Sequence, residues 1–312
     1  MTELNNMCAP CRCAAALGIF DGVHAGHREI ISAAVRLKEK CLVPAVFTLD
    51  TQSVKRKHGK PFEYIYTNRQ KLKLLGELGI EYAYSPGFDS IRDMDGEEFA
   101  AEILAKRLKA GAAICGENFR FGKNASCGAE ELVSFGKKYG FEVKVISLKK
   151  YNGKVFSSEL FRSMLREGRV LELLGMGLAP YFIDAEVIEG NRIGRTLNFP
   201  TINQRFESGQ LVPRKGVYHS HVNINGICCE AITNVGVKPT VEKDIAPLAE
   251  THILDYSGDL YGESVRVALR CFIRDEQKFA SVEELKRQVD ADIEYVRRQK
   301  EEICCTESGR KD

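Results

Sequence analysis

The sequence predicts an α/β domain with a doubly wound parallel sheet, followed by an antiparallel β-barrel or sandwich and a closing helix. Short apolar runs alternate with helical patterns over residues 14–150, which is typical of parallel strands joined by crossover helices. Near Pro180 the pattern changes to short β-rich runs punctuated by glycine and asparagine. An apolar stripe at helical spacing then closes the chain.

The first predicted strand lies within 14–20 and runs into the motif L-G-I-F-D-G-V-H-A-G-H at 17–27, before an amphipathic helix from Arg28. Two histidines, His24 and His27, are three residues apart and point to one side of the helix start. Three glycines let the backbone approach a ligand closely: Gly18, Gly22 and Gly26. Free N–H groups at a helix N-terminus attract anions, so the motif predicts a triphosphate pocket with two tunable cations.

Further elements of the first half follow in order. The apolar face of the first helix is predicted to hold Ile30, Ile31, Ala34 and Leu37. Four more strands are predicted, at 43–48, near 81–84, at 112–115 and at 141–146. The helices between them carry three apolar triplets: Leu72, Leu75 and Leu78; Phe99, Ile103 and Leu108; Leu132, Phe135 and Tyr139. In such a sheet the ligand binds at the carboxyl ends of the strands, where the histidine motif lies.

The second half is predicted to be antiparallel. Its β-rich runs are 182–188, 217–224, 228–233, 251–255 and 265–273, and Asn225-Gly226 is a hairpin dipeptide. Ser281 and Glu284 form a capping box at the start of the last helix. The buried stripe of that helix is predicted to comprise Val282, Leu285, Val289, Ile293 and Val296.

Composition limits the class of protein. The chain has 312 residues, enough for two domains, with 44% hydrophobic residues, 28% charged residues and a formal net charge of +2. We expect no nucleic-acid partner from this charge, and no apolar run reaches the roughly 20 residues of a membrane span. Eleven cysteines, among them Cys8, Cys11 and Cys13 in C-x-x-C-x-C, lack a second cluster with metal-ligand spacing. We expect reduced thiols and a cytoplasmic location.

Three motifs of the first half resemble those of the nucleotidyltransferase superfamily, and most closely the FMN adenylyltransferase half of bifunctional bacterial riboflavin kinase/FAD synthetases. They are F-D-G followed by H-A-G-H, G-E-N-F-R-F-G at 116–122, and Ser157-Ser158 with Arg162, similar to S-S-T-x-x-R. Two serines before a helix are, alone, an ordinary cap. The resemblance implies that Asn118 lines the active site and that ATP is bound by Gly18, Phe20, Asp21, Gly22, His24, His27, Ser157, Ser158 and Arg162.

The reaction that this resemblance implies is attack of an FMN phosphate oxygen on the α-phosphorus of ATP, with release of pyrophosphate. A phosphate monoester is already an anion near pH 7, so positioning and charge stabilisation by His24, His27 and Arg162, with Mg²⁺, would suffice. The chain departs from the family at three places. Residues 47–53 lack the family's prolines near the flavin, Glu159 replaces threonine, and Ile19 replaces asparagine.

The second half resembles riboflavin kinases. Residues 190–203 are similar to G-x-x-x-G-R-x-L-G-F-P-T-A-N, with Asn198 at a glycine position, and further similar segments follow in family order. The resemblance implies a Mg·ATP site at Gly190, Gly194, Arg195, Thr201 and Asn203, with Thr201 and Asn203 as oxygen ligands of Mg²⁺. Glu250 corresponds to the catalytic base for the ribityl 5′-hydroxyl, whereas His252 is expected to be structural.

The sequence therefore predicts a Rossmann-like nucleotidyltransferase domain at 1–180, a β-barrel riboflavin kinase domain at 181–300 and a polar tail at 301–312. The expected activity converts riboflavin to FMN and FMN to FAD, with ATP as co-substrate. One alternative is a monofunctional riboflavin kinase with a degenerate first domain, and another is a flavin-binding regulatory or storage protein without turnover. A different H-x-G-H transferase would leave residues 181–298 unexplained. The expected partners are the small molecules riboflavin, FMN and ATP, and the sequence specifies no oligomeric state.

Overall fold

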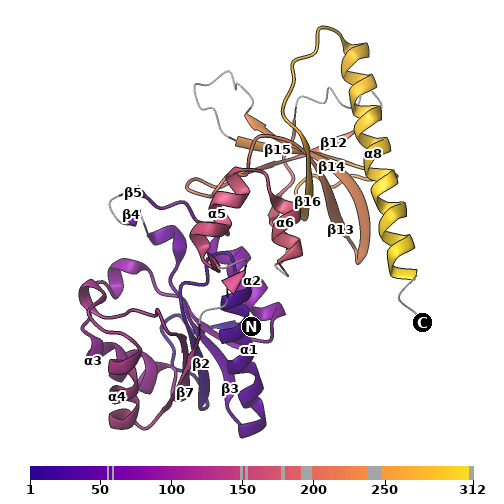
Figure 1. The fold of residues 1–312 in the computed structure, drawn as a ribbon. Helices are drawn as coiled ribbons and strands as arrows, with labels where there is room; N and C mark the ends of the chain where they lie inside the picture. Colours follow the sequence, from indigo (N-terminus) through magenta and orange to yellow (C-terminus); the bar gives the residue numbers. More distant parts are fainter. Residues whose placement is uncertain are drawn as a thin grey trace. The chain divides into compact units, whose positions relative to one another are not determined.

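A computed structural model describes residues 1–54, 56–57, 60–147, 150–151, 154–176, 180–190, 199–237 and 247–308. The chain forms two compact units (Figure 1). Unit 1 comprises Met1–Arg162 with Gly209–Leu211, and unit 2 comprises Ser163–Ser208 with Val212–Asp312. The short segment 209–211 belongs to unit 1 because Gln210 forms a β-bridge with Tyr64.

The sheet of unit 1 has six strands in the order β1-β6-β3-β2-β7-β8, and every pair is parallel. All five predicted strands are present, and the predicted parallel sheet is confirmed. They are β2 (Cys13–Leu17), β3 (Val43–Phe47), β6 (Tyr82–Tyr84), β7 (Ala110–Gly116) and β8 (Glu142–Ile146). The sequence analysis missed β1 (Thr2–Glu3), since two residues carry no periodic pattern.

Helices cover both faces of this sheet, with α1 (Ala25–Arg36) on one face and α3 (Gly96–Glu98) and α4 (Ala129–Tyr139) on the other (Figure 1). The helix expected from Arg28 begins three residues earlier, because the His24 side chain caps it. The remaining helical segments of the unit are α2 (Asn68–Glu77), a π-helix η4 (Phe99–Arg107), and the 3-10 turns η1 (Leu37–Lys40), η2 (Thr51–Ser53), η3 (Phe88–Ser90) and η5 (Lys123–Ala125).

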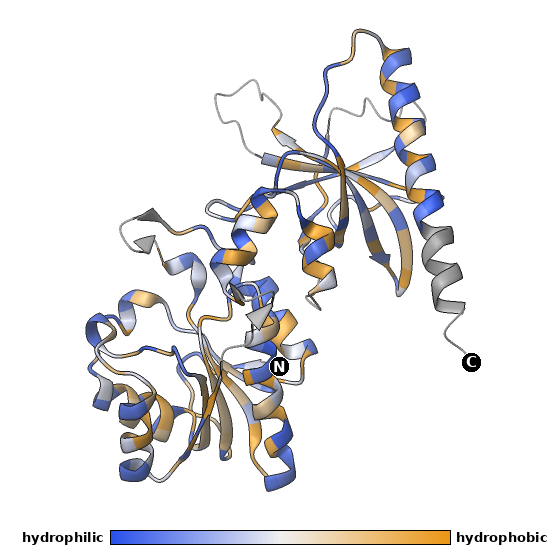
Figure 2. Cartoon of the chain, viewed as in Figure 1, coloured by the Kyte–Doolittle hydropathy of each residue, from blue (hydrophilic) through white to orange (hydrophobic). Residues whose placement is uncertain are grey.

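The central strands β2 and β7 are buried along their whole length, and in Figure 2 the apolar residues gather on the strands and on the inner sides of the helices. Two small ribbons stand outside the sheet, β4 (Arg56–Lys57) with β5 (Lys60–Pro61) and β9 (Lys150–Tyr151) with β10 (Lys154–Val155). The helices α5 (Ser158–Arg166) and α6 (Val170–Gly175) follow.

Unit 2 is an antiparallel barrel, as predicted, with the strand order β11-β16-β13-β14-β15-β12. A β-bridge between Ile188, just after β11, and Asn203 brings the two ends of the sheet together. Asn225 and Gly226 form the predicted tight hairpin, both with positive φ (51° and 84°), as a type I′ turn requires. The strands are β11 (Phe182–Glu186), β12 (Thr201–Arg205), β13 (Gly216–Ile224), β14 (Ile227–Val237), β15 (Pro247–Ile253) and β16 (Ser264–Arg274).

The barrel interior combines an apolar cluster with a buried row of hydroxyl groups. Val222, Ala231, Val265 and Val267 belong to the cluster. Thr233 Oγ1 lies 2.7 Å from Ser220 Oγ and 2.9 Å from Thr251 Oγ1, so these buried hydroxyls satisfy one another across three strands.

The last helix, α8 (Val282–Ser308), packs on the outside of the barrel, where Val296 contacts an apolar cluster. Ser281 Oγ accepts the Glu284 N–H at 3.2 Å, as the predicted capping box requires, while the Glu284 carboxylate accepts the Ala280 N–H at 2.9 Å. The barrel side of this cluster consists of Val217, Ile232, Leu254 and Ile273, and the helix itself adds Ile293 beside Val296.

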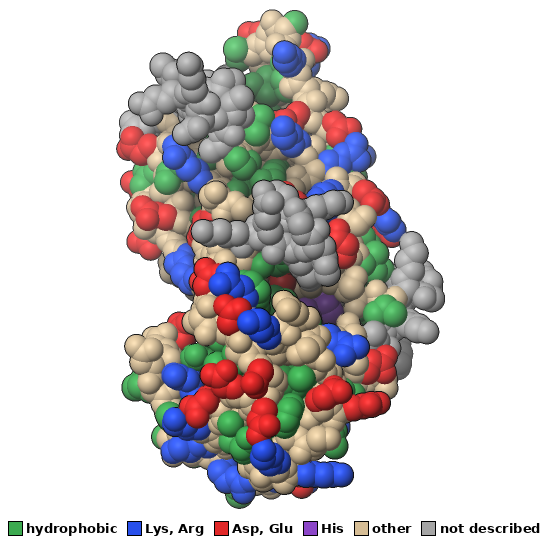
Figure 3. Space-filling view, turned by 90° about the vertical axis from the view of Figure 1, so that its left-hand side faces the viewer, with side chains coloured by type: hydrophobic (Ala, Val, Ile, Leu, Met, Phe, Trp, Pro, Cys, Tyr) green, Lys and Arg blue, Asp and Glu red, His purple; other side chains and the backbone are tan. Residues whose placement is uncertain are grey.

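Among the described residues, no helix is both long enough and apolar enough to cross a membrane. On the face drawn in Figure 3, acidic and basic side chains are interspersed. The structure describes the side chains of nine cysteines, and all nine are free thiols. Burial raises the pKa of Cys13 to about 12 and that of Cys115 to about 11, so both behave as small apolar side chains.

A buried ion pair fastens α8 to the barrel, and its loss should destabilise unit 2. Arg274 binds Asp292 through Nε at 3.0 Å and Nη2 at 2.7 Å, and Gln288 donates to the same carboxylate at 3.0 Å. Asp292→Asn leaves the guanidinium without a counter-charge, which costs about 3 kcal/mol. We expect this variant to unfold at a lower urea concentration than the parent chain, with unfolding monitored by circular dichroism at the helix band.

Arg297→Ala is the matched control, because it breaks an exposed ion pair between the same helix and Asp255. Exposed pairs contribute little, so its midpoint should equal that of the parent chain. Equal midpoints for Asp292→Asn and the parent would show that the buried pair does not hold the helix.

Candidate active sites

The first candidate site is the loop between β2 and α1, which has a strained backbone. Phe20 and Val23 adopt positive φ values of 53° and 41°, although neither is glycine and both are buried. Gly22, with φ +83°, is irreplaceable here, because a Cβ atom would lie 2.5 Å from the Phe161 ring and 2.8 Å from Ile65. Close packing therefore fixes the path of the F-D-G-V-H segment.

The two histidines of this loop lie against each other. His24 is the N-cap of α1, and its Nδ1 accepts the N–H of His27 at 3.4 Å. Because Nδ1 accepts, the proton of the neutral His24 ring is on Nε2. The rings are stacked with centroids 3.5 Å apart, and His27 Nδ1 is buried without a partner among the described residues.

Both rings are uncharged at neutral pH, so the prediction of two cations is wrong for the chain without substrate. Burial lowers the pKa of His24 to about 4. Burial also lowers the pKa of His27 well below its usual range, with added repulsion from His24 and Lys71. Removing an imidazolium from water is costly, and no carboxylate contributes to the shift of either ring.

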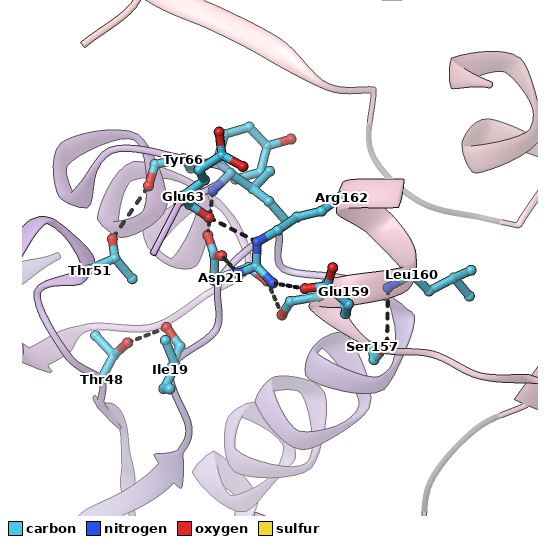
Figure 4. A network of polar contacts seen from close by, with 12 residues as sticks. Ile19, Asp21, Thr48, Thr51, Glu63, Tyr66, Ser157, Glu159, Leu160 and Arg162 are labelled. Carbon is cyan, nitrogen blue, oxygen red and sulfur yellow. Dashed lines mark hydrogen bonds and ion pairs between the residues drawn. The ribbon is translucent and has the colours of Figure 1, made fainter. Parts of the chain in front are cut away.

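The guanidinium of Arg162 is surrounded by oxygen atoms that accept its hydrogen bonds (Figure 4). Its Nη2 forms a buried ion pair with Asp21, its Nη1 lies 3.2 Å from Glu159 Oε2, and its Nε donates to the carbonyl of Glu63 at 2.9 Å. Asp21 also accepts the N–H of Ile65 at 2.9 Å. Burial raises the pKa of Asp21 and the guanidinium opposes that rise. The expected phosphate-binding arginine is therefore occupied by two carboxylates, of which Glu159 is exposed.

The hydroxyls of Ser157 and Ser158 have structural partners. Ser157 Oγ accepts the N–H of Leu160 at 3.1 Å, as a helix cap does, and Ser158 Oγ donates to the carbonyl of Asp21 at 2.8 Å. The start of α5 is thereby tied to the loop that follows β2.

Two further segments begin at the same edge of the sheet, after β7 and β3, the two strands that flank β2. Asn118 is exposed beyond β7, and a Cβ atom on Gly116 would lie 3.1 Å from its Oδ1. Beyond β3, the loop that lacks the family's prolines is fixed by hydrogen bonds instead. Thr48 Oγ1 donates to Ile19 O at 2.7 Å, and the fully buried Lys71 donates to Leu49 O.

The second candidate site is a row of polar side chains across three strands of unit 2. Asn203 on β12 is the direct partner of Glu250 on β15, and Asn234 on β14 is the partner of Glu250 on its other side. Directly opposed residues share one face of a sheet. Thr201, two residues before Asn203, donates from Oγ1 to Glu250 Oε1 at 3.0 Å.

Two acceptors of this row are buried and lack partners among the described residues: Asn203 Oδ1 and Asn234 Oδ1. The backbone of Gly190 packs directly against the Asn203 amide, since a Cβ atom on Gly190 would lie 2.3 Å from Asn203 Nδ2. Amide and hydroxyl oxygens are hard ligands, so an unpaired amide oxygen beside Thr201 fits a Mg²⁺ ion.

Thr201 also lines a cavity of about 240 Å³ at one end of the barrel. The segment 256–261 forms much of its wall. His252 bonds through Nδ1 to the carbonyl of Pro200 at 2.9 Å and so braces the chain just before Thr201. Gly194 and Arg195 lie outside the described residues.

The structure adds Asn234 to the site. This residue lies in one of the further segments that resemble riboflavin kinases, but the sequence alone predicts no role for it. Its Nδ2 donates to Glu276 at 3.3 Å, so its Oδ1 is turned away from that carboxylate. Only the register of β14 against β15 shows that it stands beside Glu250.

Comparison with known proteins assigns both halves of the chain. A family model described as FAD synthetase matches residues 7–160, and one described as riboflavin kinase matches residues 178–300. The bifunctional riboflavin kinase/FMN adenylyltransferase of Escherichia coli (strain K12) is 31% identical over 291 residues, 90% of each chain. The protein of the same name from Bacillus subtilis (strain 168) is 31% identical over 285 residues, 89% of each chain.

Among solved structures, one described as a macrolide-efflux protein from Streptococcus pneumoniae has a TM-score of 0.82 and 28% sequence identity. The similarity covers 95% of this chain and 99% of that one.

The lowered pKa of His24 predicts how stability depends on pH. The folded chain takes up the proton near pH 4 and the unfolded chain near pH 6.5. Between these values the unfolded state binds more protons, so stability falls as the pH is lowered, by up to about 1.4 kcal/mol per pH unit for this group. His24→Asn keeps a capping acceptor and removes this proton, so its urea midpoint should vary less between pH 4.5 and 6.5. Identical pH profiles would contradict the assignment.

Proposed function

The chain belongs to the family of bifunctional riboflavin kinase/FMN adenylyltransferases, and we propose that its two candidate sites divide the two reactions between them. It is a flavin-biosynthesis enzyme that uses ATP to convert riboflavin to FMN and FMN to FAD. The presence of both family domains, with relatives named for both activities, favours this function over a kinase with a degenerate first domain. We place the adenylyltransferase domain at 1–180, the kinase domain at 181–300 and a tail at 301–312.

In the adenylyltransferase domain, the FMN phosphate attacks the α-phosphorus of ATP and pyrophosphate leaves. The site needs no base, because the attacking oxygen is already anionic, and it acts by holding the phosphates in place. Gly18, Phe20, Asp21 and Gly22 form the turn that receives the triphosphate. The close packing of this turn around Gly22 supports the role proposed for these residues.

His24 and His27 enter the reaction as neutral hydrogen-bond donors. The Nε2 proton of His24 is available, because its Nδ1 is occupied by the N–H of His27. A triphosphate beside the rings favours their protonated forms, so their pKa values rise on binding and donation strengthens as charge develops. Asn118 supplies an amide from the end of β7, while Ser157 and Ser158 position the start of α5.

In the kinase domain, Glu250 accepts the proton of the ribityl 5′-hydroxyl as that oxygen attacks the γ-phosphorus of ATP and ADP leaves. The single observation that carries this assignment is the position of Glu250 between Asn203 and Asn234, with Thr201 bonded to one of its oxygens. This bond orients the carboxylate. Gly190, Gly194 and Arg195 belong to the loop proposed to cover the nucleotide.

Mg²⁺ is proposed as the metal of both reactions, with Thr201 and Asn203 holding it in the kinase domain. When bound, it neutralises phosphate charge. The unpaired Asn203 Oδ1 supports this choice of residues. We propose a cytoplasmic location, where ATP is present and free cysteines such as the nine described here stay reduced. We expect small-molecule partners and no nucleic acid.

Separate product assays test the division of labour. Glu250→Gln should lower FMN formation from riboflavin by about 10²-fold or more, because the hydroxyl loses its base, and leave FAD formation from supplied FMN intact. His27→Ala should do the reverse. Both rates are measured by separating the flavins after incubation with ATP and Mg²⁺.

Glu263→Gln is the control, since it removes an exposed carboxylate of the same domain. It should leave both rates unchanged. Ordinary FMN formation by Glu250→Gln would show that another group is the base, and loss of both activities in His27→Ala would argue against separate sites.

The departure at Glu159 gives a second test. Its carboxylate competes with phosphate for Arg162, so Glu159→Thr should lower the KM for ATP in FAD formation by about fivefold, equivalent to ~1 kcal/mol. Glu172→Thr breaks a similarly spaced exposed pair with Arg169 and should change neither reaction. An unchanged or higher KM in Glu159→Thr would mean that the carboxylate does not oppose nucleotide binding.

A further inference from the structure

A cluster of two imidazoles and a carboxylate lies on the barrel and has no part in either reaction above. His219 and His221 are two residues apart on β13, so both side chains leave the same face of the sheet. Glu230 on β14 is the direct cross-strand partner of His221. Its Oε2 lies 2.6 Å from His219 Nε2 and 3.2 Å from His221 Nε2.

The three side chains converge on one small volume. One potential ligand atom from each residue, an imidazole nitrogen or a carboxylate oxygen, lies within 4.8 Å of those of the other two. In a tetrahedral zinc site with bonds of roughly 2.0–2.2 Å, ligand atoms are about 3.4 Å apart. The observed separations differ from this value by amounts that small side-chain rotations can supply. The three side chains come together because the register of β13 against β14 places Glu230 opposite His221.

The chemistry of the set selects a class of metal. Imidazole nitrogens suit Zn²⁺, Co²⁺ and Ni²⁺, whereas Mg²⁺ and Ca²⁺ prefer oxygen ligands. Three protein ligands leave a fourth position for water. His219 is almost fully buried, with its side chain 5% exposed, while those of His221 and Glu230 are 26% and 18% exposed. An ion can therefore reach the cluster from the solvent-exposed side, where His221 and Glu230 lie.

The cluster is separate from the kinase site. Glu230 and Asn234 are on the same strand, four residues and hence about 13 Å apart. Between them on the same face lies Ile232, which packs in the apolar cluster under α8. The residues proposed to hold Mg²⁺ are on β12 and the proposed base is on β15, whereas this cluster is on β13 and β14.

We propose that His219, His221 and Glu230 form a binding site for one divalent transition-metal ion of the Zn²⁺ class. Each imidazole binds through Nε2 with its proton on Nδ1, and Glu230 supplies one carboxylate oxygen. The ion links β13 to β14 beside the attachment of α8, and so stabilises the barrel. This role is independent of the Mg²⁺ that we assign to Thr201 and Asn203.

The test is Co²⁺ binding to the full-length chain after treatment with a chelator. Excess Mg²⁺ fills the oxygen sites, and Cys8→Ser/Cys11→Ser/Cys13→Ser removes the thiols of the C-x-x-C-x-C segment. We expect one equivalent of Co²⁺, visible d–d absorption and no thiolate charge-transfer band. His221→Gln and Glu230→Gln, made in the same background, should each raise the Kd for Co²⁺ by about 100-fold or more. Loss of a residue that only hydrogen-bonds to a metal ligand already lowers metal affinity about 10- to 100-fold, and these two residues bind the metal directly.

A second readout is thermal stability with and without Zn²⁺. The ion should raise the Tm of the parent chain and leave that of His221→Gln unchanged, because a ligand that binds only the folded state stabilises it. Glu186→Gln, an exposed carboxylate on β11, is the control and should bind Co²⁺ like the parent. Absence of Co²⁺ binding, equal binding by His221→Gln, or a thiolate band would each overturn the proposal.

Discussion

The buried ion pair between Asp21 and Arg162 holds the first site together. Asp21 stands in the loop after β2, Arg162 is on α5, and the two residues are 141 positions apart in the sequence. The same two side chains bind the backbone of Glu63 and Ile65. Two charges are stable in such a place only when paired and hydrogen-bonded, as they are here. Beside this ion pair, Gly22 and Phe161, the chain neighbours of Asp21 and Arg162, also approach each other closely.

The two sites that we propose would handle phosphate by different physical means. The first relies on a strained turn and on imidazoles that burial keeps neutral, while its guanidinium, Arg162, is already paired with Asp21 and Glu159. The second is built from side-chain oxygens aligned across neighbouring strands, with Glu250 between two amides. This difference fits the chemistry, because the FMN phosphate needs no base whereas the ribityl hydroxyl does.

Local pattern was enough to predict the parallel sheet, the antiparallel barrel and the closing helix, since each rests on hydrophobic period and turn residues. The motif around His24 and His27 was placed correctly at the end of β2. The charge of these rings was not predictable, because it depends on what buries them. Asn234 acquires meaning only from its register beside Glu250, and the partners of Arg162 come from distant segments. Both are consequences of tertiary structure.

The loop after β3, residues 48–53, is ordered although it contains no proline. A proline in a loop stabilises the folded state because it reduces the conformational entropy of the unfolded chain. Here Thr48, Lys71 and Ser53 hold the same stretch through hydrogen bonds to Ile19, Leu49 and Asp50. The order of this loop therefore rests on hydrogen bonds of the folded state and not on a restricted unfolded chain.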